Sequence, residues 1–213
     1  MIARSDNRPS QDDLPNVATQ AGRHASPLDR SLQLIQGCGL KRDDPIIDVS
    51  GGDAALVAAL LLLGYTDVTV VQSSAVGSSA FLERLGDWES CLTVLTGDVT
   101  QLHLKRRFAL WHDRGRFCLL RYAEDRQRYV EVLEEALRPE GHLVIATIGP
   151  EGPQQYGSHW VRCYSLATLT QEMGCRFELA EHSLDMFEAP SGEHHHFLHC
   201  RFRRHAPHPT WSA

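Results

Sequence analysis

The segment PIIDVSGGDAALVAALLLL, residues 45–63, joins an apolar strand to an apolar helix through a turn of small residues. Pro45 to Val49 predicts a buried strand, Ser50 to Asp53 a tight turn, and Ala54 to Leu63 a helix. The helix is too short to cross a bilayer, so we expect it to be buried in a protein core. A strand, a tight turn and a helix in this order indicate the start of a parallel α/β sheet.

The sequence on both sides of this segment continues the alternation of strands and helices. Further strands are predicted at Val68–Val71, Leu92–Leu95, Phe108–His112 and His142–Thr147, and further helices at Leu28–Ile35, Ala75–Leu85, Glu124–Leu137 and Leu166–Met173. The last two strands, Arg176–Ser183 and His195–Arg203, have no helix between them. We therefore predict an α/β fold, a Rossmann-like three-layer sandwich whose mostly parallel seven-stranded sheet has helices on both faces and a C-terminal antiparallel β-hairpin.

Length and composition fit one domain with two short arms. The chain has 213 residues, of which 42% are hydrophobic and 23% charged, as in an ordinary globular domain. Residues 1–26 are polar and follow no apolar period, so they predict a flexible arm; residues 27–204 form the domain, and residues 205–213 a flexible tail. The N-terminal stretch MIARSDNRPSQDDLPN lacks the apolar core of a secretory signal, and we expect a cytoplasmic protein.

Charge and residue spacing argue against several classes of function. The formal net charge is −6, whereas nucleic-acid-binding domains usually carry a basic excess, so neither a nucleic-acid nor a membrane partner is expected. The six cysteines include no C-x-x-C pair and predict reduced thiols. His182 and His199 could approach each other across the hairpin, but the twelve histidines show no recognisable ligand spacing, and no metal site is expected. The oligomeric state is not predicted.

Candidate ligand-binding residues follow the predicted strands, because ligands of open parallel sheets bind beyond the carboxyl ends of the strands. The small side chains of Asp48–Ala54 allow a ligand to approach backbone N–H groups, although a purely structural turn would also use glycine. The loop Thr96–Val99 offers a carboxylate and a backbone N–H that can bind the polar edge of an adenine ring. Asp98 is equally suited to be a turn residue or a helix cap.

The loop after the fourth strand carries four side chains of different chemistry in WHDRG, residues 111–115. Trp111 is suited to wall an apolar pocket, and His112 or Asp113 to orient or deprotonate a substrate group. We take His112, Asp113 and Arg114 as candidate catalytic residues. The alternative is a core position for Trp111 and a surface charge pair between Asp113 and Arg114.

These loops, in this order and together with YVEVLEEALRPEGHLVIATIGPEGP (residues 129–153), resemble the class I S-adenosylmethionine (SAM)-dependent methyltransferases. The resemblance runs from about Leu28 to Arg204 and is strongest at residues 45–52, 97–99, 108–116 and 129–153. It implies SAM as the cofactor and transfer of a methyl group to an unidentified acceptor, a small molecule or a protein side chain.

The resemblance also implies which residues bind the cofactor. They come from the ends of the first four predicted strands and the loops that follow Val49, Val71, Leu95 and His112: Asp48, Ser50, Gly51, Gly52, Gln72, Asp98, Val99 and Trp111. Residues 48–52 would lie under the methionine part of SAM, Gln72 would face the ribose, and Asp98 with Val99 would hold the adenine. Trp111 and His112 would line the pocket, and residues 113–116 would border the acceptor.

The chain departs from the family pattern at Ser50, Asp53 and Gln72. Ser50, Gly52 and Ala54 stand where the family's first motif has three glycines, and Asp53 brings a negative charge to the start of a helix, where it also suits an N-cap. Gln72 stands where the family has a carboxylate, which accepts hydrogen bonds from both ribose hydroxyls. These departures favour an alternative, a degenerate, noncatalytic methyltransferase-like protein for interaction or ligand sensing.

A third hypothesis is a nicotinamide dehydrogenase, which shares the strand, turn and helix at its start. The helix-free terminal strand pair and the lack of a G-x-G-x-x-G pattern argue against it.

Overall fold

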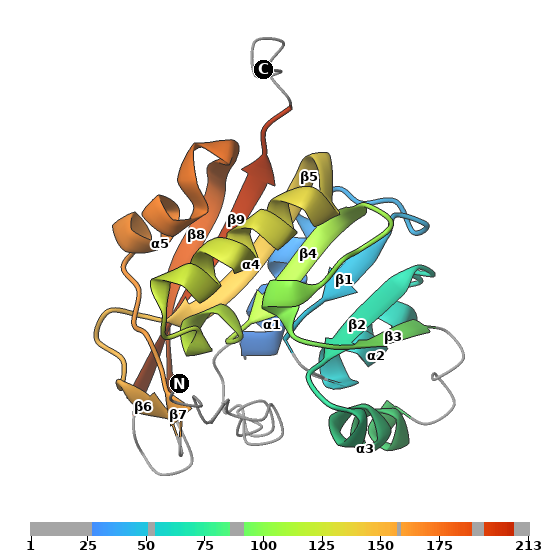
Figure 1. Ribbon diagram of the computed structural model, residues 1–213, viewed down its shortest axis with the longest axis horizontal. Helices are drawn as coiled ribbons and strands as arrows, with labels where there is room; N and C mark the ends of the chain where they lie inside the picture. Colours follow the sequence, from blue (N-terminus) through green and yellow to red (C-terminus); the bar gives the residue numbers. More distant parts are fainter. Residues whose placement is uncertain (1–26, 51–53, 86–91, 157–158, 189–193, 207–213) are drawn as a thin grey trace, which may run out of the picture.

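The fold is built on a seven-stranded sheet in the order β3-β2-β1-β4-β5-β9-β8 (Figure 1). The strands from β3 to β5 in this order run parallel, whereas β9 and β8 are antiparallel to their neighbours. The strands are β1 (Ile46–Asp48), β2 (Val68–Gln72), β3 (Leu92–Thr96), β4 (Phe108–Arg114), β5 (Leu137–Ile148), β8 (Phe177–Glu188) and β9 (His194–Arg204). The prediction of a mostly parallel sheet that ends in an antiparallel hairpin is confirmed.

The computed structural model describes residues 27–50, 54–85, 92–156, 159–188 and 194–206. The predicted arm over residues 1–26 and residues 207–213 of the predicted tail lie outside these ranges. So do the turn residues Gly51, Gly52 and Asp53, for which the sequence predicted cofactor contacts and a helix cap.

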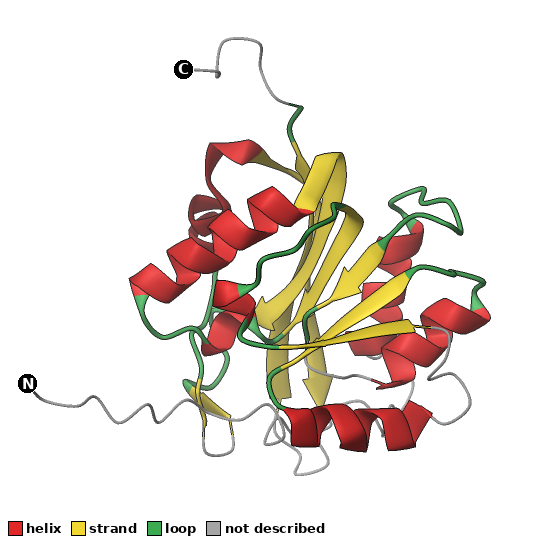
Figure 2. Ribbon diagram, turned by 45° about the vertical axis from the view of Figure 1, so that its right-hand side comes forward, coloured by secondary structure: helices red, strands yellow, loops and turns green. Residues whose placement is uncertain are grey.

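Helices cover both faces of the sheet, which makes the three layers that the sequence predicted (Figure 2). The helices are α1 (Pro27–Gln36), α2 (Ala54–Leu62), α3 (Ala75–Leu85), α4 (Ala123–Ala136) and α5 (Leu166–Met173). A two-residue ladder of β6 (Gln155–Tyr156) and β7 (His159–Trp160), which the sequence did not predict, follows β5. Within the described ranges, no helix has the length and apolar content that crossing a membrane requires.

The sheet separates two hydrophobic cores, because successive side chains of a strand point to opposite faces. Ile46 packs with side chains of α1, α2 and α3, whereas its neighbour Ile47 packs with side chains of α4 and α5. β2 divides in the same way, with Val70 on the first face and Val71 on the second. Strands buried on both faces are apolar at nearly every position, which is why the sequence pattern identified them.

β5 begins five residues earlier than the predicted strand at His142, because Leu137 already pairs with Phe108 of β4. The register then shifts, so that Leu110 pairs with His142. Within the shifted segment Glu140 has a φ of 65°, a left-handed conformation that is rare outside glycine and suits a bulge. The irregular segment Pro139–Gly141 therefore lies within β5 and does not precede it.

We expect the packing of α4 on the sheet to contribute strongly to stability. Leu133 is fully buried in the core between α4 and the sheet, so Leu133→Ala should lower the free energy of unfolding by about 2 to 5 kcal/mol. Urea denaturation followed by circular dichroism measures this loss. Glu135→Ala, at an exposed position of the same helix, is the matched control and should change stability little; equal losses in both variants would contradict the assigned packing.

Candidate functional site

The predicted site residues that the structure describes gather at the carboxyl edge of the parallel sheet. β1 lies between β2 and β4, so the chain leaves β1 toward β2 on one side and later returns to β4 on the other. This is the point at which the strand order reverses and at which ligands bind in open α/β sheets. Asp48, Gln72 and Arg114 are the last residues of β1, β2 and β4, and Asp98 follows β3 directly after Gly97.

Asp48 is a fully buried carboxylate whose hydrogen bonds converge on one oxygen. Its Oδ1 accepts hydrogen bonds from His112 Nδ1 at 2.7 Å, from Ser50 Oγ at 2.6 Å and from Ser50 N at 3.2 Å. Ser50 Oγ in turn accepts from the backbone N of Arg114 at 2.8 Å. The Ser50 side chain therefore ties the loop after β1 to the end of β4.

The environment of Asp48 favours its ionised form. Burial alone would raise the pKa of this carboxyl group, but the hydrogen bonds from His112 and Ser50 outweigh burial and hold the pKa below its ordinary value of 3.8. The second oxygen, Oδ2, is buried and has no hydrogen-bond partner in the part of the chain that the structure describes. A buried carboxylate oxygen of this kind can accept a hydrogen bond from a cationic ligand group.

Gln72 places a second unpaired polar atom near Asp48. The side chain is 1% exposed, and its Nε2 has no hydrogen-bond partner among the described residues. Asp48 pairs with Val70 in the sheet, and residues two apart share a face, so Asp48 and Gln72 lie on the same face at the ends of neighbouring strands. An acceptor on Asp48 and a donor on Gln72 thus lie at one edge of the sheet.

Asp98 caps the short 3-10 helix η3 (Val99–Gln101), as one of its two sequence interpretations predicted. Its Oδ1 accepts hydrogen bonds from the backbone N and from Oγ1 of Thr100, both at 2.9 Å. Val99 is buried, whereas Asp98 is only half-buried. The cap fixes the carboxylate at the carboxyl edge of β3, and this position is compatible with the contact to an adenine that the sequence predicted.

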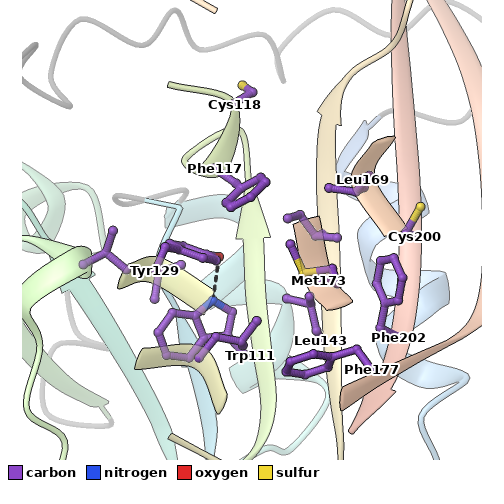
Figure 3. Close-up of a cluster of buried hydrophobic side chains, with 14 of the residues drawn as sticks. Trp111, Phe117, Cys118, Tyr129, Leu143, Leu169, Met173, Phe177, Cys200 and Phe202 are labelled. Atoms are coloured by element: carbon purple, nitrogen blue, oxygen red, sulfur yellow. Dashed lines mark hydrogen bonds between the residues drawn. The ribbon is translucent and has the colours of Figure 1, made fainter. Parts of the chain in front are cut away.

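Trp111 lies in the hydrophobic core between the sheet and α4, with no exposed surface. Its Nε1 donates to Tyr129 Oη at 2.9 Å, and the two rings meet edge to face with their centroids 5.8 Å apart (Figure 3). The residue pattern had left open whether this side chain walls a pocket or packs in the core, and the family resemblance had placed it among the cofactor-binding residues. The structure places it in the core, because β4 turns Trp111 toward α4 and His112 toward the opposite face.

Asp113 is also fully buried, which contradicts the alternative of a surface charge pair with Arg114. It accepts hydrogen bonds from Tyr129 Oη at 2.6 Å, from the backbone N of Arg116 at 2.7 Å and from that of Phe117 at 3.0 Å. Gly115, with a φ of 95°, makes the turn that brings these two backbone groups back to the carboxylate. Burial outweighs these donors and raises the pKa of Asp113 to about 6.

His112 and Asp113 therefore point into opposite cores, and neither candidate catalytic side chain reaches solvent. Arg114 is half-buried at the end of β4. It faces His199 of β9, whose pKa is lowered chiefly by burial and further by Arg30 and Arg114, while Asp185, at 2.9 Å, opposes the shift.

His182 does not approach His199, because it pairs with Cys200 and is exposed on the other face of the hairpin. Among the described residues, no three His, Cys, Asp or Glu side chains are grouped closely enough to bind a metal ion.

The structure adds two residues that the sequence interpretation did not include. Tyr129 links Trp111 to Asp113, and Ser31 of α1 lies with its Oγ 3.1 Å from His112 Nε2. Both positions fit the apolar stripes of their helices and carry no separate sequence signal. Only the packing of α1 and α4 on opposite faces of the sheet brings them to the end of β4.

Solved structures with the same fold include several methyltransferases. The N-methyltransferase NodS from Bradyrhizobium japonicum WM9 matches with a TM-score of 0.67 and 16% identity over 84% of this chain and 96% of that chain. A SAM-dependent methyltransferase from Methanosarcina mazei matches with a TM-score of 0.67 and 14% identity, over 81% of this chain and 98% of that chain. The 1,6-didemethyltoxoflavin-N1-methyltransferase from Burkholderia thailandensis matches with a TM-score of 0.65 and 19% identity, over 83% of this chain and 76% of that chain.

The similarity at these identities shows the fold, which is that of the class I SAM-dependent methyltransferases. NodS and the Burkholderia enzyme have both been solved with bound S-adenosylhomocysteine. No protein-family model matches the chain, and no match was found among curated proteins.

The raised pKa of Asp113 predicts a specific pH dependence of stability. Because its folded pKa of about 6 lies above the ordinary 3.8, the folded state binds the proton more tightly than the unfolded chain. This contribution to the free energy of unfolding is complete below pH 3.8 and is lost as the pH rises through about 6.

We therefore expect the free energy of unfolding of the wild type, relative to that of Asp113→Asn, to fall as the pH rises through this window. Urea denaturation of both proteins at several pH values measures the difference. Other titrating groups cancel in the difference. A constant difference would show that folding does not raise the pKa of Asp113.

Proposed function

We propose that this protein is a SAM-dependent methyltransferase that acts on a small molecule or a protein side chain. The proposal rests on one observation: two buried polar atoms, Asp48 Oδ2 and Gln72 Nε2, lack partners among the described residues at the edge where this fold binds its ligands. Buried polar groups in folded proteins are nearly always paired, so these two atoms offer one acceptor and one donor to a polar ligand at this edge.

SAM supplies the groups that these two atoms lack. Its amino-acid part carries an ammonium group, which would donate to the ionised Asp48 in a charge-assisted hydrogen bond. Its ribose oxygens would accept from Gln72 Nε2. Asp98 and Val99, placed after the neighbouring strand β3, would bind the adenine, and Ser50, Gly51 and Gly52 would pass under the methionine part.

The protein's contribution to the reaction would be binding and alignment. Bound SAM supplies a methyl group on a sulfonium centre, which is already activated for transfer, so alignment of an acceptor does most of the work. His112 and Asp113 are held in buried hydrogen bonds and serve the structure around the site. Arg114 is the candidate that stays at the acceptor side, where its guanidinium would orient an acceptor.

The second candidate is a noncatalytic protein that uses the same fold for interaction or ligand sensing. It is favoured by the neutral Gln72, at the position where the resemblance implies a ribose-binding carboxylate, and by the burial of His112 and Asp113. Methyl transfer to any acceptor by the purified protein would exclude it.

Isothermal titration calorimetry of the purified protein with SAM, and separately with S-adenosylhomocysteine, is the direct test. The unpaired atoms of Asp48 and Gln72 predict saturable binding of both ligands. An absence of heat at millimolar ligand would reject the cofactor assignment and leave the noncatalytic alternative.

Gln72→Glu should increase the affinity for SAM. The substitution removes the hydrogen bond that Gln72 Nε2 would donate. A carboxylate instead accepts charge-assisted hydrogen bonds from both ribose hydroxyls, and the net gain of about 1 to 3 kcal/mol corresponds to about ten- to hundredfold in Kd. The control is Gln72→Leu, which removes the polar atoms at similar volume and should weaken binding. Unchanged or weaker affinity of Gln72→Glu would show that Gln72 does not face the ribose.

A further inference from the structure

Helix α1 reaches the proposed cofactor site through a chain of buried hydrogen bonds. Ser31, His112 and Asp48 all have no exposed surface. Ser31 Oγ lies 3.1 Å from His112 Nε2, and His112 Nδ1 lies 2.7 Å from Asp48 Oδ1. The chain connects α1, β4 and β1 in that order.

The direction of these hydrogen bonds follows from the charge of Asp48. An ionised carboxylate only accepts, so the hydrogen of the Asp48–His112 bond is on His112 Nδ1. In the neutral imidazole, Nε2 is then an acceptor, and the Ser31 hydroxyl donates to it. The charge of Asp48 thus sets the tautomer, and the hydrogen bond with Ser31 holds the orientation of the ring.

The orientation of the ring decides which oxygen of Asp48 stays available. His112 and Ser50 together supply three donors to Oδ1, and Oδ2 has no partner among the described residues. If the ring were free to turn, Oδ1 would keep only the two donors of Ser50, and the direction of Oδ2 would be less well defined.

α1 is held firmly enough to position Ser31. Leu34 and Ile35 are fully buried in the core on this face of the sheet. Arg30, the residue before Ser31, donates to Ser183 Oγ at 2.8 Å and to Glu181 Oε1 at 3.2 Å on strand β8. The helix is thus fixed to the terminal hairpin on one side and to His112 on the other.

We propose that Ser31 and His112 are positioning residues for the ammonium group of the cofactor, so that docking of α1 and binding of the amino-acid part of the cofactor are coupled. This inference rests on the proposed function. Because coupling is reciprocal, the ligand also stabilises the docked position of α1. Ser31 lies in α1, which precedes the first strand, and not in any of the loops that follow the strands of the sheet.

The test compares two ligands that differ in the group concerned. S-adenosylhomocysteine carries the ammonium group, whereas 5′-methylthioadenosine has the same adenosine and lacks the amino-acid part. Ser31→Ala should raise the Kd for S-adenosylhomocysteine about three- to tenfold, as expected for the loss of one buried hydrogen bond. Its Kd for methylthioadenosine, measured by the same calorimetry, should stay unchanged.

Two further variants separate positioning from general damage to the fold. Gln36→Ala changes an exposed residue of the same helix and should affect neither ligand. His112→Phe removes both hydrogen bonds at similar volume and should weaken S-adenosylhomocysteine binding at least as much; adding Ser31→Ala to it should then have no further effect. Thermal denaturation of each variant checks that it is folded at the temperature of the titration.

Each outcome decides the proposal. A loss confined to S-adenosylhomocysteine supports the positioning role. An unchanged affinity in Ser31→Ala, or equal losses for both ligands, would overturn it while leaving the proposed function intact. Failure of the wild type to bind either ligand would overturn the proposed function and this inference with it.

Discussion

The burial of the Asp48 carboxylate is the constraint on which the carboxyl edge of the sheet depends. An ionised carboxylate is stable inside a protein only if donors replace the water it has lost. These donors come from Ser50, in the loop after β1, and from His112, on β4. This one charge therefore constrains the geometry of that loop, the register of β1 on β4 and the position of α1 over His112.

The sheet carries a second buried carboxyl group, that of Asp113, on its other face. Its comparison with Asp48 shows what decides whether a buried carboxyl group in this protein is ionised. Asp48 and Asp113 are both fully buried, and burial raises the pKa of each. Asp48 is bonded to an imidazole and a hydroxyl, and its pKa is lowered; Asp113 is bonded to two backbone N–H groups and a phenol, and its pKa is raised. The imidazole of His112 sets the two carboxyl groups apart, and it bonds to the one on the side of the proposed cofactor site. On the other side, Asp113 organises η4 (Phe117–Leu119) and the core around Tyr129.

This division changes the view of residues 111–114, which the sequence interpretation assigned to a loop and which lie in β4. In the sequence they suggested one cluster of catalytic groups, but the strand directs Trp111 and Asp113 to one face and His112 and Arg114 to the other. Much of the chemistry in this segment therefore supports the fold. The unpaired atoms of Asp48 and Gln72, on neighbouring strands of the α1 face, are the observation that connects this fold to a ligand. A fold alone does not determine a function, and the methyltransferase proposal rests on these atoms.

The sequence by itself determined the order of strands and helices, the parallel sheet and the terminal hairpin, because each depends on local periodicity and on buried strands being apolar throughout. It also placed Asp48, Gln72 and Asp98 at the ends of strands that meet at one edge. Only the tertiary structure decided how Trp111 packs, why Leu137 already belongs to β5, and that Ser31 contacts His112 from a helix remote in sequence. These outcomes depend on side-chain direction, strand register and the docking of helices. They are set by packing between distant segments, which no local pattern records.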